Sequence, residues 1–539
     1  MPALSLNAVR TLLSVSILCA LAACGGDGGS SDSSNGAITV GGTPTPTPGA
    51  TPAPIGAPIN GNPTATPAPT SPTPTPTPGP TPAPAPVTAS FSISAFPVAV
   101  SGGGKVFNMA DNFFDDVWLP AAPVYNYGFP NALIQYVNTD GSLDVAWLDY
   151  SSGGGGPKAS GLNTLGHIFI THINANLTAG ATVDTGITTY RLLGFTKDPS
   201  GNYYLAFNAD HSFKTSTAGD LNNVNGNELR IAKSTGPSFV SAAWNTLIFG
   251  DNDNNQDRTP GNAGEAGGGV LAFDVANQAV VSYVAHQMNW KSGTVSTRHQ
   301  AGIMRLVSAS TGAVITPSGD ASGSGAGWFY SHNFDQRLIV DNGNYYTLAH
   351  GDAYSRTLGI SGWTNASYRN NGTVFDHSYW NIPGNEGDNN TNSEEGQFVR
   401  LANGNFAVVH TTSDGRAARD VRAVLASGND GSTLSEIWLT TNATNKQAVM
   451  PKIAAVGSNF LLTYGVWDST NRTNHSINWY GQLLNSSLAP ISAVQNITGV
   501  EFVTDLPSFT FPAGPHAGAV GWVSGNGSHG LTVNVVVQN

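Results

Sequence analysis

Short apolar runs, bounded by turns rich in glycine and asparagine, dominate the chain from residue 88 to residue 539. Many runs alternate apolar and polar positions or are rich in β-branched and aromatic residues, which is typical of strands. Long stretches with a helical period of apolar residues are hard to find. The pattern predicts one large all-β domain over residues 88–539.

One unit recurs through this domain: an apolar strand, a Gly/Asn turn and an aromatic-rich strand. The clearest copy runs from Arg337 to Leu348, and the segment from Phe398 to Val409 repeats it. Each unit has room for four short strands, and radial repetition of four-stranded sheets forms a β-propeller. We therefore predict a seven-bladed β-propeller with an insertion at Gly250–Gly269. The seven turns fall at residues 141, 201, 277, 343, 404, 457 and 518.

A tandem of β-sandwiches is the alternative architecture. It predicts repeats of about 100 residues, whereas the observed turns are much closer together. The signature motifs of WD40 and kelch repeats are absent. Asn-Gly turns tolerate the positive φ angles of tight hairpins, which agrees with a blade pattern.

The N-terminus combines one positive charge, Arg10, with the apolar run Leu12–Ala23. This run is too short to span a bilayer comfortably and is typical of a secretory signal. Its end, Leu21-Ala22-Ala23-Cys24, resembles the lipobox of bacterial lipoproteins. The resemblance implies that residues 1–23 are a signal peptide and that Cys24 carries a lipid anchor.

Gly25 follows the cysteine, where the family's sorting rule would place Asp to retain a protein at the inner membrane. The resemblance therefore implies attachment to the outer membrane or cell surface. The other cysteine, Cys19, lies in the signal, so the mature chain has no cysteine pair for a disulfide or a thiolate metal site. Residues 24–87 are Gly/Ser-rich and then Pro/Thr-rich, a composition that predicts a disordered, extended linker.

The formal net charge is −12, and only 10% of residues are charged. This balance, without basic runs, argues against nucleic-acid binding. The overall field of such a protein also does not attract a polyanion, although a local basic patch could do so. Motifs of phosphate-binding loops, serine hydrolases and zinc proteases are absent.

Polar residues follow the aromatic strand in almost every unit, so the sequence predicts a ring of His and Asp around one mouth of the propeller channel. Ligands of propellers commonly bind at such a mouth. The alternative is that these residues cap turns or link neighbouring blades. The residues are Asp149, Asn208, Asp210, His211, His286, His350, Asp352, His410, Asp414 and Asp468.

The strongest local constellation lies in the unit that turns at residue 343. His332 precedes one hairpin strand and His350 follows the other, so the two can approach one another. Tyr354 and Arg356 come next along the chain. This layout loosely resembles the BNR-type propeller polysaccharide lyases, such as the ulvan lyases. The resemblance implies His332 or His350 as the base, Arg356 as the group that neutralises a uronate carboxylate, and Tyr354 as the acid.

The insertion contains a second candidate site, because oxygen-bearing residues occupy alternate positions as in the opening of a calcium loop. The pattern then departs from an EF-hand, with Gln256 where glycine is expected and Asn262 where the bidentate glutamate should be. Calcium binding and a solvated Asn/Asp loop both stay open. The candidate Ca²⁺ ligands are Asp251, Asp253, Asn255 and Asp257.

Two functional hypotheses follow. In the first, the propeller is a non-catalytic surface module that binds an extracellular polymer, a polysaccharide above all, or a partner protein at the propeller mouth, while the lipid holds the chain at the membrane. Tryptophans near loops and strand ends favour a sugar ligand, although most Trp residues in a propeller pack in the core. In the second, the propeller is a polysaccharide lyase or hydrolase. The incomplete set of catalytic roles favours the binding module.

Overall fold

The chain is described from a computed structural model, which places most of residues 89–539. Cys24, the signal peptide and the linker lie outside the described residues, so the structure does not test those predictions. The described residues are 89–100, 133–149, 166–189, 192–209, 228–249, 269–292, 295–318, 336–351, 356–382, 393–468, 470, 477–499, 507–525 and 530–539.

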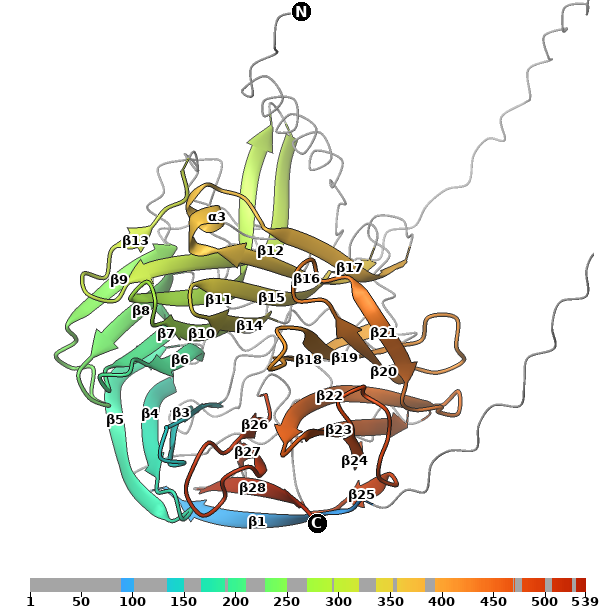
Figure 1. Cartoon of the computed structure of the whole chain (residues 1–539). Helices are drawn as coiled ribbons and strands as arrows, with labels where there is room; N and C mark the ends of the chain where they lie inside the picture. The colour runs from blue at the N-terminus through green and yellow to red at the C-terminus, as the bar shows by residue number, and fades with distance from the viewer. Residues whose placement is uncertain are drawn as a thin grey trace, which may run out of the picture. The chain divides into compact units, whose positions relative to one another are not determined.

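Seven four-stranded antiparallel sheets make up this part of the chain, arranged around a common centre as a seven-bladed β-propeller (Figure 1). The predicted fold class is therefore confirmed. Blade one consists of β2 (Leu133–Val137), β3 (Leu143–Asp149), β4 (Gly166–Ile173) and β5 (Ala179–Thr189). Blade two consists of β6 (Leu192–Lys197), β7 (Tyr203–Ala209), β8 (Glu228–Ser234) and β9 (Trp244–Phe249). Blade three consists of β10 (Gly269–Asp274), β11 (Ala279–Ser292), β12 (Val295–Ser308) and β13 (Val314–Ile315).

The remaining four blades follow in chain order, except that the last takes its outer strand from the N-terminal side. They are β14 (Gln336–Asp341), β15 (Asn344–Gly351), β16 (Arg356–Thr364) and β17 (Phe375–Ile382); β18 (Ser393–Arg400), β19 (Phe406–Thr412), β20 (Asp420–Ala426) and β21 (Thr433–Trp438); β22 (Lys446–Val456), β23 (Asn459–Asp468), β24 (Ile477–Leu484) and β25 (Gln495–Ile497); β26 (Phe509–Thr510), β27 (Val520–Gly525), β28 (Gly530–Gln538) and β1 (Phe91–Ala99).

The predicted repeat corresponds to the inner hairpin of each blade. All seven predicted turns lie between the first and second strands of successive blades. In blade four the turn residues Asn342 and Gly343 have φ angles of 47° and 82°. Such positive angles suit Asn-Gly in a two-residue hairpin, as the sequence predicted.

The hydrophobic core is divided among the interfaces between blades. Each of seven clusters of buried residues joins two neighbouring sheets, from blades one and two around to blades seven and one. Each sheet thus buries both faces, because a propeller blade packs against two others. Trp363, Trp467, Trp479 and Trp522 all belong to these clusters, with at most 6% of each residue exposed. These four tryptophans are therefore core residues, as expected for most Trp residues of a propeller.

The ring closes through β1, which pairs with β28 along its whole length, from Phe91 opposite Gln538 to Ala99 opposite Gly530. Phe91 and Val98 enter two different interblade clusters. Blade seven is therefore completed by residues from the other end of the domain. The repeat search did not predict this, because it detected only the inner hairpins.

The second and third strands of blade three are the longest of the described strands. β11 and β12 stay paired from Ala279 opposite Ser308 to Ser292 opposite Val295. Only the first part of β11, Ala279–Val284, pairs with β10. The rest forms a two-stranded ribbon, which projects in yellow-green in Figure 1.

A short helix, α3 (Asn365–Arg369), follows β16. It begins with a capping box, in which Thr364 and Ser367 each accept the other's backbone N–H through their hydroxyl oxygens. Its buried Tyr368 packs against blade three. In the described part of the chain, no helix has the length and apolar character needed to cross a membrane.

Candidate functional site

The two faces of the ring differ in the connections they carry. On one face, here called the turn face, the chain connects the first strand to the second in every blade and the third to the fourth in blades one to six; residues 342–343 are an example. The opposite face, here called the loop face, carries the connections from the second strand to the third and from blade to blade. Longer connections belong to it, including residues 100–132, 150–165, 210–227 and 250–268.

The chain enters the ring at the turn face, where Ala89 donates a backbone hydrogen bond to Ile491 (3.3 Å). The two ends of β1 thus lead to different faces. Function in propellers and barrels is usually carried by loops held on a rigid scaffold.

The structure tests the predicted constellation only in part. His350 lies in β15 opposite Leu358, and Arg356 begins β16 opposite Ile382. Both positions therefore lie at the loop-face end of blade four, on adjacent strands. The hairpin of β14 and β15 also places Gln336, the first residue of β14, at the same end as His350. His332 and Tyr354 lie outside the described residues, as do Asp251, Asp253, Asn255 and Asp257 of the calcium prediction.

The prediction of a ring of His and Asp is wrong for His410, and two of its acids have the structural role that was considered as the alternative. His410 is only 1% exposed, so it belongs to the interior of blade five rather than to an open mouth. Asp468 accepts hydrogen bonds from Lys446 (2.6 Å) and from the Thr470 backbone N–H (3.0 Å). It therefore caps a turn and joins two strands, which is the alternative role considered for these residues.

Asp414 has a similar structural role. It accepts a hydrogen bond from Nη1 of Arg422 at 3.1 Å. The guanidinium groups of Arg416 and Arg422 lie 4.2 Å and 5.4 Å from the ring centre of Trp438. Both arginines thus stack with this half-buried tryptophan, an arrangement that stabilises the outer part of blade five.

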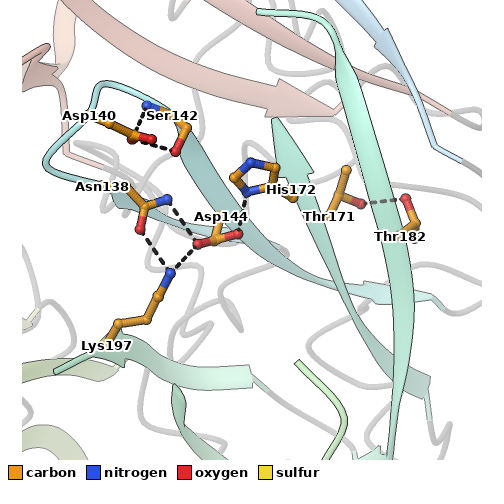
Figure 2. Close-up of polar contacts among 8 residues, drawn as sticks. All are labelled: Asn138, Asp140, Ser142, Asp144, Thr171, His172, Thr182 and Lys197. Carbon is orange, nitrogen blue, oxygen red and sulfur yellow. Dashed lines mark hydrogen bonds and ion pairs between the residues drawn. The ribbon is translucent and has the colours of Figure 1, made fainter. Parts of the chain in front are cut away.

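A polar cluster that the sequence analysis missed lies near the turn face, between blades one and two (Figure 2). Its centre is Asp144 of β3, which is 1% exposed. The carboxylate accepts hydrogen bonds from Nζ of Lys197 (2.7 Å) and Nδ2 of Asn138 (2.9 Å), and Nδ1 of His172 lies 2.9 Å away. Lys197 also donates to Oδ1 of Asn138 (2.9 Å). The buried charge is thus compensated from both blades.

Lys197 lies at the end of β6, where its ammonium group is 4.6 Å from the ring centre of Tyr203 and 5.7 Å from that of Tyr136. Burial lowers the pKa of Lys197, but the hydrogen bond and charge of Asp144 outweigh this effect, so the pKa lies above its usual range. Burial raises the pKa of both tyrosines. The lysine is therefore a permanent cation, which suits an ion pair better than a general base.

A cavity of about 490 Å³ occupies the central channel, lined by the first strands of blades one to five and by residues 507–508. Two glutamines hold that segment in place. Gln135 donates to the carbonyl oxygen of Pro507 (2.6 Å), and Gln397 both donates to and accepts from the backbone of Ser508 (2.9 Å and 3.2 Å). These amide groups are thus engaged with the backbone of the chain that enters blade seven.

Arg337 also lines the channel and is 7% exposed. Its Nε donates to the carbonyl oxygen of Gly396 at 2.8 Å, which ties blade four to blade five. Among the residues described, no group of three or more His, Cys, Asp or Glu is placed to hold a metal ion. The described channel therefore contains polar groups in structural roles, and the loop face carries the candidate functional residues.

The topology, the closure and the contrast between the two faces define this chain as a seven-bladed β-propeller protein with an elaborated loop face. No protein-family model matches the sequence. No curated protein matches it either. Solved structures are similar at low sequence identity.

The α-L-arabinanase of Penicillium chrysogenum, solved with arabinobiose, is 11% identical, with a TM-score of 0.30, and the match covers 47% of this chain and 73% of that one. The NanB sialidase of Streptococcus pneumoniae is 9% identical, with a TM-score of 0.36 and coverage of 69% and 71%. Hydrazine synthase of Kuenenia stuttgartiensis is 10% identical, with a TM-score of 0.40 and coverage of 77% and 98%. Since these values are low and the three proteins differ in activity, the comparisons do not indicate a ligand.

Proposed function

We propose that this chain is a cell-surface lipoprotein whose propeller binds an extracellular polysaccharide at the loop face. The observation that carries the proposal is the concentration of long connections on that face, opposite the point where the chain enters the ring. A rigid ring with long connections on one face is suited to presenting a binding surface.

The residue types of these connections favour a sugar ligand. They are rich in Gly, Asn and Ser, and they include aromatic residues such as Trp118 and Trp328. Aromatic faces offer flat apolar surfaces, while amides and hydroxyls provide hydrogen bonds to a polyhydroxylated chain.

Affinity electrophoresis of the full chain in gels containing neutral or uronate-rich polysaccharides tests this proposal. We expect at least one polysaccharide to retard the protein without new reducing ends or unsaturated uronates. If no polysaccharide in a broad panel retards the chain, the proposal is wrong.

A second candidate function is polysaccharide lyase or hydrolase activity. The placement of His350 and Arg356 at one end of blade four favours it. The same panel tests it by ultraviolet absorbance of unsaturated uronates and by reducing ends. Product that disappears in His350→Ala would establish an enzyme and replace the binding-only function.

The membrane attachment rests on the lipobox-like end Leu21-Ala22-Ala23-Cys24. We expect the chain to incorporate labelled fatty acid and to sediment with membranes, because a multi-chain anchor holds a protein stably. Cys24→Ser should abolish both properties. Equal labelling and sedimentation of the Ser variant would show that Cys24 is not the anchor.

A further inference from the structure

Trp438 is a partly exposed tryptophan at the loop face of blade five. It ends β21, the outer strand of that blade (Figure 1). Because β21 follows the turn-face connection 427–432, its last residue lies at the loop face. The connection from β19 to β20, residues 413–419, comes to the same face and carries Asp414 and Arg416. These residues therefore belong to one described part of the loop-face rim.

The register places Trp438 beside Arg422 on one face of blade five. The two residues are opposite one another in β21 and β20, and cross-strand partners share a face. Val424, two residues further along β20, lies on that face too and belongs to the cluster that includes Tyr346 of blade four. Trp438 therefore lies where the interface between blades four and five reaches the loop face.

Two guanidinium groups hold the indole ring of Trp438 in a fixed orientation. Those of Arg416 and Arg422 lie 4.2 Å and 5.4 Å from its ring centre. Arg416 donates to the buried carboxylate of Asp420 (2.7 Å) and to the carbonyl oxygen of Thr440 (2.8 Å). Asp420 also accepts a hydrogen bond from the hydroxyl of Thr440 (2.8 Å). A ring held in this way loses little conformational freedom when a ligand binds to it.

Three polar groups beside the ring have hydrogen-bonding capacity left over. Asp414 and Glu436 each bind Arg422 through one carboxylate oxygen, Oδ2 and Oε2 respectively. Among the described residues, no donor binds their other oxygens and no acceptor binds the indole N–H of Trp438. The side chains of Asp414 and Glu436 are 44% and 48% exposed. The rim therefore offers two acceptors and one donor around an aromatic ring.

We propose that Trp438 is the stacking platform of a subsite for a neutral polysaccharide, with Asp414 and Glu436 accepting hydrogen bonds from sugar hydroxyls. The inference rests on the proposed polysaccharide-binding function and narrows it to one subsite and one class of ligand. The apolar face of a sugar ring suits the flat face of an indole, and the hydroxyl donors around that ring suit free carboxylate oxygens.

The charges at this rim favour a neutral ligand over an acidic one. Two arginines face three carboxylates, those of Asp414, Asp420 and Glu436, so the group carries one net negative charge. Both guanidinium groups already bind these carboxylates. A uronate carboxylate would meet charges of its own sign here, which is unfavourable.

Affinity electrophoresis of the full chain in gels of dextran, arabinan, galactan or polygalacturonate tests the subsite. We expect at least one neutral polysaccharide to retain the chain equally at low and high salt, because salt screens ion pairs and the ligand forms none. Trp438→Ala should weaken this retention about tenfold, since the stacking surface is lost. Trp438→Phe keeps a flat ring and should weaken retention less.

Trp244 provides the matched control. It begins β9, the outer strand of blade two, and it is also partly exposed. It lies at the turn-face end of its strand, however, and its indole N–H donates to the carbonyl oxygen of Ala309 (3.2 Å). Trp244→Ala should leave retention unchanged, with thermal unfolding showing that folded variants are compared. Equal weakening in Trp438→Ala and Trp244→Ala would overturn the subsite.

A second measurement uses the unmodified chain, so it does not depend on the folding of a variant. N-bromosuccinimide oxidises accessible indole rings, and mass spectrometry of peptides locates the oxidised residues. A polysaccharide that retains the chain should protect Trp438 and leave the oxidation of Trp244 unchanged. Failure of Trp438 to react in the free chain, or equal reaction with and without polysaccharide, would overturn the subsite.

The outcomes distinguish the subsite from the proposed function. Retention by a neutral polysaccharide that Trp438→Ala does not weaken would overturn the subsite alone. Retention by polygalacturonate alone would overturn the ligand class and leave the proposed function standing. No retention by any polysaccharide would overturn both.

Discussion

Asp144 is a buried carboxylate whose partners come from two blades. A substitution of this residue therefore weakens the contact between blades one and two. The ion pair with Lys197 crosses from blade one to blade two at 2.7 Å. Removing one partner of a buried pair leaves the other charge desolvated, which costs more than the pair itself contributes. The pair therefore contributes to the packing of blade one against blade two.

We expect Asp144→Asn to lower the free energy of unfolding by about 3 kcal/mol, because Lys197 would keep its charge without its carboxylate. Chemical denaturation measures this loss. The control is Asp140→Asn in the same turn, where an exposed carboxylate accepts hydrogen bonds from Ser142 that an amide oxygen can also accept. A loss in Asp140→Asn as large as in Asp144→Asn would contradict the role assigned to the buried pair.

A double-mutant cycle distinguishes the pair from local packing. Lys197→Met should cost about as much as Asp144→Asn, since it leaves the buried carboxylate without the lysine cation. Combining the two changes should cost less than the sum of the single losses, because neither charge is then left alone. Additive losses would show that the two residues act independently.

At the scale of the blades, buried tyrosines and acids join one sheet to the next. Asp274 of β10 accepts a hydrogen bond from the hydroxyl of Tyr345 in β15 at 2.7 Å, and Asp274 is fully buried. Burial, followed by the hydrogen bond and charge of Asp274, strongly raises the pKa of Tyr345. The neutral hydroxyl is thus part of the contact between blades three and four.

This contact predicts that the free energy of unfolding falls at alkaline pH. In the unfolded chain Tyr345 ionises near its ordinary pKa of 10.0, whereas in the folded chain it stays neutral to higher pH. The stabilisation is therefore fully present below about pH 10 and is lost as pH rises further. Tyr345→Phe should cost about 1–3 kcal/mol at neutral pH, and its stability should fall less steeply above pH 10 than that of the unmodified chain.

The control is Tyr346→Phe, because Tyr346 packs on the other face of the same strand, against Phe406 of blade five. Unfolding midpoints between pH 8 and about pH 11 provide the measurement, over the range in which an ordinary tyrosine titrates. An unchanged alkaline slope in Tyr345→Phe would contradict the assignment.

At the scale of the whole molecule, closure depends on β1. Deleting residues 89–100 together with the linker would expose the edge of β28 and remove Phe91 and Val98 from two clusters. We expect such a chain to lose cooperative unfolding and to aggregate, because an open ring leaves an unpaired edge strand. Calorimetry and light scattering measure these effects.

Deletion of residues 27–85 alone is the matched control. It removes the Pro/Thr-rich segment and keeps β1, so its melting temperature should equal that of the full chain. A cooperative transition at the same temperature in the longer deletion would show that β1 is dispensable for the ring.

Much of the fold could be predicted because it repeats locally. The inner hairpins each place an apolar strand, a turn with Gly or Asn and an aromatic strand within a short stretch, and seven copies define seven blades. The candidate site was less predictable. A histidine at the end of an aromatic strand was the pattern for both His350 and His410, but His350 lies at the loop-face end of its blade whereas His410 is buried. The polar cluster around Asp144 was missed, and the one signal for it in the sequence was a single acidic residue within an apolar strand.

The sequence by itself determined the inner hairpins, their turns and the number of blades, because these depend on neighbours along the chain. Only the tertiary structure decided which residues meet across blades: β1 with β28, Lys197 with Asp144, and Gln397 with residue 508. It also decided which face carries the long connections. Such contacts join distant segments, so they follow from packing the whole ring and not from any local period.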